Sequence, residues 1–384
     1  MNITEKIERL RSQRLDELSA LKARGGKIIG YLCNYAPVEL IKAAGAVPVR
    51  LLRGGHQASI AAERFLRTDA CPFCRACLGN FESDPLYQLV DAVVAVNTCD
   101  MMRRLPEVIE RYFKIPIFQV YLPRTSEPLP HRLVEFQRQL VRLSGELERF
   151  SGRAGRHFEI TTAITEFNRL RQVLRELDKS RELDRPVITE SELLDISALA
   201  GLAEPSDLCD FLTSNFQSAE CPSSGTRDNF EQSNPANQRP SGSRPRLLLA
   251  GSIVTDDDRW LIRLIEERAA VVADAFCSGA RWFGEELTVD ADSWASVAGY
   301  YFNRIPCPCR RPNERLYEHL TQLVSQRRVQ GVIYKTLLYC DSWAFEAVRL
   351  QQRLKIPFLH LANDYSPESR EQVRTRVEAF LETL

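Results

Sequence analysis

Residues 91–121 read DAVVAVNTCDMMRRLPEVIERYFKIPIFQVY, and this stretch decides the expected fold. Its first part, residues 91–97, is an apolar run rich in β-branched side chains, which predicts a strand. Residues 101–113 then show the apolar spacing of a helix, and residues 115–121 predict a second strand. A strand, a helix and a strand in this order indicate a βαβ unit with parallel strands.

The same alternation extends over both halves of the chain. We therefore expect an α/β fold with two flavodoxin-like or Rossmann-like parallel-sheet lobes. Strands are predicted at 27–33 and 47–52 in the first half, and at 246–250, 270–275, 331–334 and 357–361 in the second half. Helices are predicted at 38–44, 257–268, 314–327 and 342–354.

A short motif occurs once in each half. Cys99 is followed by Asp100, a predicted helix and then Lys114-Ile-Pro, and Cys340 is followed by Asp341, a predicted helix and Lys355-Ile-Pro. The lysine follows the cysteine by fifteen residues in both copies. Duplication of one α/β unit is the simplest explanation for such a match.

The composition along the chain predicts four segments. Residues 1–130 form an N-terminal α/β lobe, and residues 131–214 form a helical segment without strand candidates. Residues 215–245 are mostly small and polar, so we expect a flexible linker there. Residues 246–384 form the C-terminal α/β lobe.

The charges and the apolar runs exclude several classes of protein. Lysine and arginine number 51 and aspartate and glutamate also number 51, so no basic field attracts nucleic acid. No apolar run reaches the roughly 18 to 20 residues that cross a bilayer. Residues 1–24 lack the apolar core of a signal peptide. We therefore expect a cytoplasmic protein that binds neither nucleic acid nor a membrane.

The eleven cysteines are more than a core of this size requires, and cytoplasmic thiols are not expected to form disulfides. Cys99 and Cys340 each lie between a predicted strand and a predicted helix, at the sheet edge where ligands gather. A helix N-terminus there favours the thiolate. Each half also has a Cys-Pro segment, at Cys71 and Cys307. We expect the cysteines to bind a metal cofactor through their thiolates. One alternative is that they are small buried residues of the hydrophobic core. Another is a zinc site, which the Cys71-x-x-Cys74 spacing would suit.

Residues 30–48, GYLCNYAPVELIKAAGAVP, resemble the opening motif of 2-hydroxyacyl-CoA dehydratase and benzoyl-CoA reductase subunits. The Cys71-Pro-Phe segment and Cys99-Asp100, with the Arg-Arg-Leu that follows at 103–105, resemble the next two motifs of that family. The segment from Gly331 through Cys340-Asp341 resembles the last one. The resemblance covers nearly the whole chain outside the predicted linker, and the motifs occur in the family's order.

This resemblance implies a cofactor, partners and a reaction. Family subunits hold one [4Fe-4S] cluster with three cysteines, which correspond by motif to Cys71, Cys99 and Cys340. The resemblance also implies a paralogous partner subunit and an ATP-dependent iron–sulfur activator that supplies electrons of low potential. The expected substrate is an acyl-CoA, which is dehydrated or reduced by radical chemistry. An iron atom without a protein ligand would hold a substrate oxygen.

The sequence departs from this pattern in its surplus of cysteines. A related branch of the family carries a double-cubane [8Fe-9S] cluster, which requires more thiolates, in a chain that pairs with itself as a dimer. For a second ligand set we predict Cys33, Cys74 and Cys309, whereas Cys77 and Cys307 stay unassigned.

Two further residues and three functions remain open. Tyr35 and Glu39 follow the first predicted strand and are weak candidates for binding substrate or acting as an acid. Residues in such positions more commonly cap a helix or lie on the surface. The first function is the iron–sulfur subunit of an acyl-CoA dehydratase or reductase. The second is a homodimeric double-cubane reductase of small molecules, and the third is a non-catalytic redox or scaffold partner.

Overall fold

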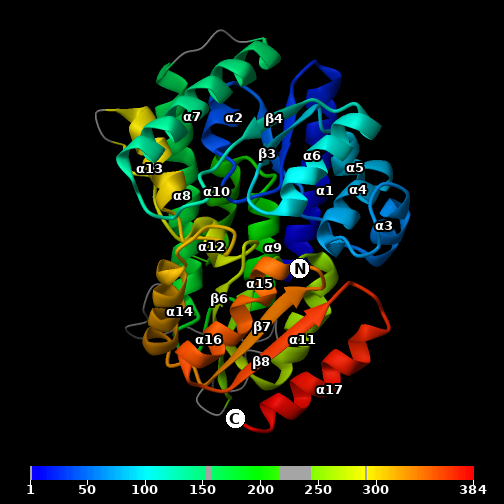
Figure 1. Cartoon of the computed structure of the whole chain (residues 1–384), viewed down its shortest axis with the longest axis vertical. Helices are drawn as coiled ribbons and strands as arrows, with labels where there is room; N and C mark the ends of the chain where they lie inside the picture. Colours follow the sequence, from blue (N-terminus) through cyan, green and yellow to red (C-terminus); the bar gives the residue numbers. More distant parts are fainter. Residues whose placement is uncertain (1, 153–156, 217–243, 290–291) are drawn as a thin grey trace.

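Two four-stranded parallel sheets form the framework of the protein (Figure 1). The structure is a computed structural model that describes all residues except 1, 153–156, 217–243 and 290–291. The first sheet has the strand order β2-β1-β3-β4, and the second has the order β6-β5-β7-β8. Since the two orders are equivalent, the predicted α/β fold with two duplicated parallel-sheet lobes is confirmed.

The strands coincide with the apolar runs of the sequence. Every residue of β3 is buried, because helices cover both faces of a parallel sheet. All eight predicted strands are present, with ends that differ from the prediction by a few residues. They are β1 (Ile28–Tyr31), β2 (Val47–Arg50), β3 (Ala92–Val96), β4 (Ile117–Val120), β5 (Arg246–Gly251), β6 (Ala270–Ala275), β7 (Gly331–Leu337) and β8 (Phe358–Asn363).

Seventeen α-helices of the described chain surround these sheets. Up to the end of the helical segment they are α1 (Ile3–Ala23), α2 (Val38–Ala43), α3 (His56–Ala61), α4 (Pro72–Ser83), α5 (Pro85–Gln88), α6 (Asp100–Phe113), α7 (Pro130–Ser151), α8 (His157–Ser180), α9 (Glu190–Ala200) and α10 (Pro205–Phe216). The remaining ones are α11 (Arg259–Arg268), α12 (Ala280–Phe283), α13 (Ser293–Asn303), α14 (Glu314–Gln326), α15 (Asp341–Ala344), α16 (Glu346–Leu354) and α17 (Ser369–Leu381). No helix among these is long and apolar enough to cross a membrane.

The repeated Cys-Asp-helix-Lys motif begins at a helix N-cap and ends at a left-handed lysine in both lobes. Cys99 is the N-cap residue of α6, and Cys340 is the N-cap residue of α15. Lys114 and Lys355 end α6 and α16 in the left-handed conformation, with φ of 57° and 54°. A left-handed residue commonly ends a helix, but it is usually glycine. The shared use of lysine there supports an origin by duplication.

The helical segment and the predicted linker meet at α10. This helix continues to Phe216, two residues beyond the predicted boundary, because Asn215 is held by the carbonyl oxygen of Phe211 and by Lys6. Most of the predicted linker, residues 217–243, lies outside the described residues. The division of the chain into four segments stays a prediction.

Helix α13 belongs to the second half of the sequence but packs in the core of the first lobe. Its residues Val297, Tyr301 and Phe302 share one apolar cluster with Ile29 and Leu40. Figure 1 shows α13 beside α7, in the half of the molecule that holds the first sheet. The two halves of the chain are therefore interlocked rather than placed side by side.

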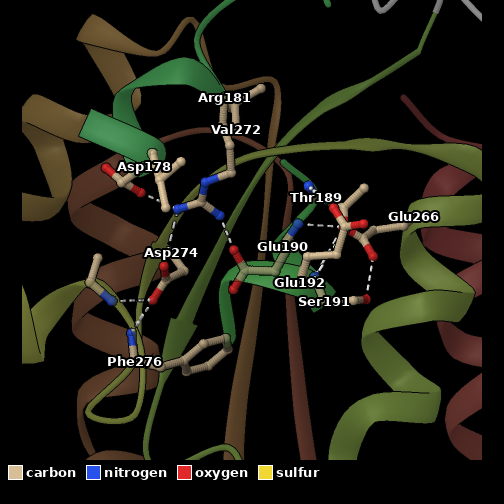
Figure 2. Close-up of polar contacts among 12 residues, drawn as sticks. Asp178, Arg181, Thr189, Glu190, Ser191, Glu192, Glu266, Val272, Asp274 and Phe276 are labelled. Atoms are coloured by element: carbon tan, nitrogen blue, oxygen red, sulfur yellow. Dashed lines mark hydrogen bonds and ion pairs between the residues drawn. The ribbon is translucent and has the colours of Figure 1, made fainter. Parts of the chain in front are cut away.

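A buried ionic cluster joins the helical segment to the second sheet (Figure 2). Arg181, which follows α8 and is 1% exposed, forms ion pairs with Asp178, Glu190 and Asp274. Glu190 lies in α9 and Asp274 lies in β6, so one guanidinium group connects three elements. Arg327 adds a second ion pair to Asp178, at 2.7 Å.

Glu266 of α11 lies beside this cluster and caps the N-terminus of α9 (Figure 2). Its Oε1 accepts hydrogen bonds from the backbone N–H groups of Glu190 at 2.6 Å and Ser191 at 3.3 Å, and its Oε2 contacts the Ser191 hydroxyl. Burial raises the pKa of Glu266 from 4.5 to about 7, although these donors act in the opposite direction.

We expect Glu266→Gln to remove a pH-dependent loss of stability. Between pH 4.5 and pH 7 the folded state keeps the proton of Glu266 and the unfolded state releases it. The free energy of unfolding of the wild type should therefore fall across this range, by on the order of 3 kcal/mol. Glutamine resembles the protonated carboxyl group, because its oxygen can accept from the two N–H groups and its nitrogen can donate to Ser191.

Urea unfolding at pH 5 and pH 8 tests this expectation. The exposed neighbour Glu267→Gln serves as the matched control and should lose stability with pH as the wild type does. Equal losses in Glu266→Gln and Glu267→Gln would show that Glu266 does not cause the effect.

Candidate cofactor site

The carboxyl ends of the strands in both lobes face a common region between the lobes. In Figure 1 the arrows of β7 and β8 point toward the half of the molecule that holds the first sheet. Each strand order reverses direction between two neighbouring strands, β1 and β3 in one sheet and β5 and β7 in the other. Open α/β sheets bind ligands outside the carboxyl ends of the strands at this position.

A cavity lies at these strand ends and is lined mainly by sulfur-bearing and apolar side chains. Its volume is about 110 Å³. A single water requires roughly 10–15 Å³ of such volume, so the cavity has room for a group of many atoms. We call it the thiol-lined cavity, because seven cysteines from both lobes line it: Cys33, Cys71, Cys74, Cys99, Cys277, Cys307 and Cys340.

Three of these cysteines are N-cap residues of helices. Cys71 precedes α4, Cys99 precedes α6 and Cys340 precedes α15. Cys99 Sγ accepts a hydrogen bond from the backbone N–H of Met102 at 3.4 Å. Pro72 occupies the first position of α4, where its missing N–H group leaves no donor unsatisfied. The backbone N–H group of Met102 thus points toward a sulfur atom that could be a thiolate.

Each lobe also contributes a pair of hydrogen-bonded thiols. The hydrogen bond from Cys74 lowers the pKa of Cys71 to about 7. The hydrogen bond from Cys309, together with the nearby Arg281, lowers the pKa of Cys307 to about 6, against the effect of burial. The pKa values of the donors Cys74 and Cys309 are raised well above the usual range of a thiol. The two Cys-Pro segments therefore have corresponding roles in the two lobes.

The remaining four thiols of the cavity are partly buried, which disfavours their charged form. Burial raises the pKa of Cys33 to about 11 and that of Cys99 to about 12. Burial likewise raises the pKa values of Cys277 and Cys340. Thiolates at these positions require a positive partner close by, and a metal ion can provide it.

Three buried arginines supply positive charge to the same cavity. Arg50, Arg281 and Arg304 line it, whereas no Asp or Glu of the described residues does so. Arg281 Nη1 donates to Cys277 Sγ at 3.2 Å, and its Nη2 donates to the carbonyl oxygen of Pro306. Arg304 Nη2 donates to the carbonyl oxygens of Arg281 and Trp282, both at 2.7 Å. A cavity with this charge favours an anionic occupant.

These side chains fit a thiolate-bound iron–sulfur cluster. Among the described residues, no three His, Cys, Asp or Glu side chains are grouped closely enough to hold a single metal ion. One zinc ion needs its four ligands within about 2.3 Å of a common point. In a cubane each cysteine binds its own iron, so the ligands are spread around a larger body. Seven thiols spread around one cavity, with cationic side chains and no carboxylate, suit the second arrangement.

The cysteines predicted as ligands lie at or near this cavity. Cys71, Cys99 and Cys340 line it, as do Cys33 and Cys74 of the second predicted set. Cys309 does not line it, but it is hydrogen-bonded to Cys307.

Two other cysteines lie apart from the cavity. Cys77 is fully buried in the core of the first lobe, with its sulfur 3.8 Å from the Tyr87 hydroxyl. Cys209 is also fully buried in this core. Neither lines the cavity.

The two weak candidates that follow the first strand, Tyr35 and Glu39, have different positions. Tyr35 lines the cavity, and its hydroxyl accepts the N–H group of Cys307 at 3.2 Å. Glu39 does not line it; its carboxylate pairs with Arg171 at 2.5 Å and accepts the Tyr301 hydroxyl at 2.5 Å. Arg171 and Glu39 are both almost inaccessible to water. Glu39 therefore forms a buried ion pair in the core and does not face the cavity.

Sequence reasoning left several residues of the cavity out of both ligand sets. Cys277 follows β6 just as Cys33 follows β1, and this position had marked it only as an outside candidate. Cys307 was left out of both ligand sets although its Cys-Pro segment matches that of Cys71. Arg50, Arg281 and Arg304 carried no signal, because an arginine in a sequence does not reveal that it will be buried.

Comparison with known proteins gives one family and several relatives. The family described as 2-hydroxyglutaryl-CoA dehydratase, D-component, matches residues 33–384. YjiM of Escherichia coli K12, described provisionally as a dehydratase subunit, is 26% identical over 95% of this chain and 93% of its own length. The (R)-phenyllactyl-CoA dehydratase beta subunit of Clostridium sporogenes is 20% identical over 95% of this chain and 93% of its own length. One of the subunits of benzoyl-CoA reductase from Thauera aromatica is 21% identical over 93% of this chain and 91% of its own length.

Proposed function

The chain belongs to the family of the 2-hydroxyglutaryl-CoA dehydratase D-component, and from this premise we propose that it is the iron–sulfur subunit of an enzyme that dehydrates or reduces an acyl-CoA. One observation carries the proposal: seven cysteines from two duplicated lobes line one cavity. This cavity lies at the carboxyl ends of the strands, where the strand order of each sheet reverses direction. Relatives of similar length are subunits of dehydratases and of a reductase that act on CoA thioesters.

The proposed ligands of a [4Fe-4S] cluster are Cys71, Cys99 and Cys340. Their positions at three helix N-termini support this assignment, because the helix dipole and backbone N–H groups favour a thiolate there. When bound, the cluster would supply an electron and a Lewis-acidic iron. For a double-cubane cluster the proposed additional ligands are Cys33, Cys74 and Cys309. Cys277 and Cys307 compete for that role, because both line the cavity.

The other side chains of the cavity keep water out and hold its walls. Phe73, Leu337 and Trp343 give it an apolar surface. The pKa of Tyr35 is raised to about 12 by burial, so its hydroxyl keeps the proton at neutral pH. This hydroxyl holds the N–H group of Cys307 across the interface of the two lobes. Tyr35 is therefore proposed as a positioning residue rather than as an acid.

Partners are part of the proposal. Four exposed apolar side chains lie near Cys340, and such patches often form interfaces between proteins. They would contact a paralogous subunit or a second copy of this chain, and they are Leu338, Tyr339, Phe345 and Val348. We also propose a cytoplasmic location and an ATP-dependent iron–sulfur activator as the electron donor. A homodimeric double-cubane reductase of small molecules and a non-catalytic redox or scaffold partner are the alternative functions.

Anaerobic preparation followed by measurement of iron and acid-labile sulfide per chain tests the proposal. About four irons per chain would support one cubane and make CoA thioesters the first substrates to assay. About eight would support the double cubane. Zinc, or a protein that takes up neither iron nor sulfide on reconstitution, would contradict the proposal.

A further inference from the structure

A second hollow adjoins the thiol-lined cavity. It lies between α1, α9, the end of β2 and the segment that leads into α11, and it has a volume of about 40 Å³. Its walls include Leu52, Leu194 and Ile262. We call it the arginine pocket, because four arginines line it: Arg11, Arg50, Arg53 and Arg259.

Two of these arginines form ion pairs with carboxylates of the described residues, and two do not. Arg53 pairs with Asp84 and Asp256, at 2.9 and 2.6 Å. Arg259 pairs with Asp195 at 2.7 Å and with Glu8 at 3.3 Å. By contrast, Arg11 is half-buried and has no hydrogen-bond or ion-pair partner within the parts of the chain that the structure describes.

Arg50 is the more unusual of the two unpaired arginines. Its side chain is 2% exposed, and Nη2 donates to Asn34 Oδ1 at 2.6 Å and to the carbonyl oxygen of Cys277 at 2.7 Å. Its Nε and Nη1 are buried and have no hydrogen-bond partner among the residues that the structure describes. A buried guanidinium with unused donors and no carboxylate is unfavourable unless a ligand supplies acceptors.

Arg50 also forms the wall between the two hollows. It lines both the arginine pocket and the thiol-lined cavity. Adjacent residues of the chain likewise lie on opposite sides of this wall: Ile253 and Cys277 line the cavity, and Val254 and Ser278 line the pocket. A molecule bound in one hollow is therefore about one layer of side chains away from the other.

We propose that the arginine pocket binds an oxyanion of the substrate, a phosphate or a carboxylate group, about one layer of side chains from the thiol-lined cavity. That this anion belongs to the substrate rests on the proposed function, whereas the anion site rests on the unpaired Arg11 and Arg50. The pocket volume of about 40 Å³ is a few times the roughly 10–15 Å³ that one water requires. The pocket therefore has room for a group of a few non-hydrogen atoms. Guanidinium groups bind phosphate and carboxylate groups through paired N–H donors.

Calorimetric titration of the full-length protein with inorganic phosphate, and separately with acetate, tests this site. In a low-salt buffer free of other oxyanions, the wild type should bind at least one of the two probes saturably at one site. Binding of phosphate would indicate a phosphate group of the substrate, and binding of acetate alone would indicate a carboxylate. Arg11→Gln should weaken binding about tenfold, the effect expected for loss of one charge-assisted hydrogen bond.

Arg9→Gln is the matched control, since it removes the same charge from an exposed position of α1 that does not line the pocket. It should change the affinity less than about twofold, because the high dielectric constant of water weakens the field of an exposed charge. Arg50→Gln should weaken binding as well, and its thermal melting curve shows whether it folds. The site is refuted if neither probe binds saturably, or if Arg9→Gln and Arg11→Gln weaken binding equally. Iron and sulfide content, measured on the same samples, decides the proposed function separately.

Discussion

Cys340→Ala is expected to lose nearly all of the iron and sulfide that the wild type takes up. Cys340 ends the loop after β7, lines the thiol-lined cavity and is the N-cap residue of α15. Its loss removes one of the three proposed protein ligands of the cluster. Removal of residues that only support metal ligands already weakens metal binding by about 10- to 100-fold. Loss of a ligand itself should exceed that range.

The matched control for this experiment is Cys77→Ala. Cys77 is a fully buried cysteine whose sulfur lies in the core of the first lobe, near Tyr87, and not in the cavity. Iron and sulfide are measured after anaerobic reconstitution of both variants, and circular dichroism shows that both are folded. The ligand assignment is wrong if Cys340→Ala keeps its iron or if the control loses as much iron as Cys340→Ala does.

Arg181→Met is expected to destabilise the protein by about 3–5 kcal/mol. The variant keeps much of the side-chain volume but leaves Glu190 and Asp274 buried without a cation (Figure 2). Both carboxylates are less than 2% exposed, so water cannot replace the lost partner. A buried ion pair contributes little over an apolar pair, but the removal of one partner is costly because the other charge stays desolvated.

Urea unfolding followed by tryptophan fluorescence measures this effect. Arg169→Met is the control: Arg169 also belongs to the helical segment and forms an ion pair with Asp210, but both side chains are more than half exposed. Its loss should cost roughly 0.2–1 kcal/mol. A similar loss of stability in the two variants would show that the Arg181 cluster is not a major source of stability.

The sequence alone predicted the fold well, for a physical reason. Strands of a parallel sheet are covered on both faces, so each appears as a continuous apolar run that local inspection can recognise. Residues 92–96 are an example, since all five are buried in β3. The motif of Cys99 and Cys340 was recognisable for a similar reason, because strand, cysteine and helix are consecutive in the chain.

Other features depended on residues that lie far apart in the sequence. Glu39 appeared to be a candidate at the site until the fold placed Arg171, 132 residues away, against its carboxylate. Arg50 carried no signal until Asn34 and Cys277 enclosed it. Likewise, only the structure shows that α13 packs in the first lobe.

The sequence by itself therefore determined the strands, the duplication and the cysteines at the strand ends, because local patterns of apolar and sulfur-bearing residues specify them. The tertiary structure decided which thiols share one cavity, which charges are paired and which arginines stay without a carboxylate. Pairing of this kind depends on contacts between distant segments and on the exclusion of water around them, and neither is visible in a local stretch of sequence.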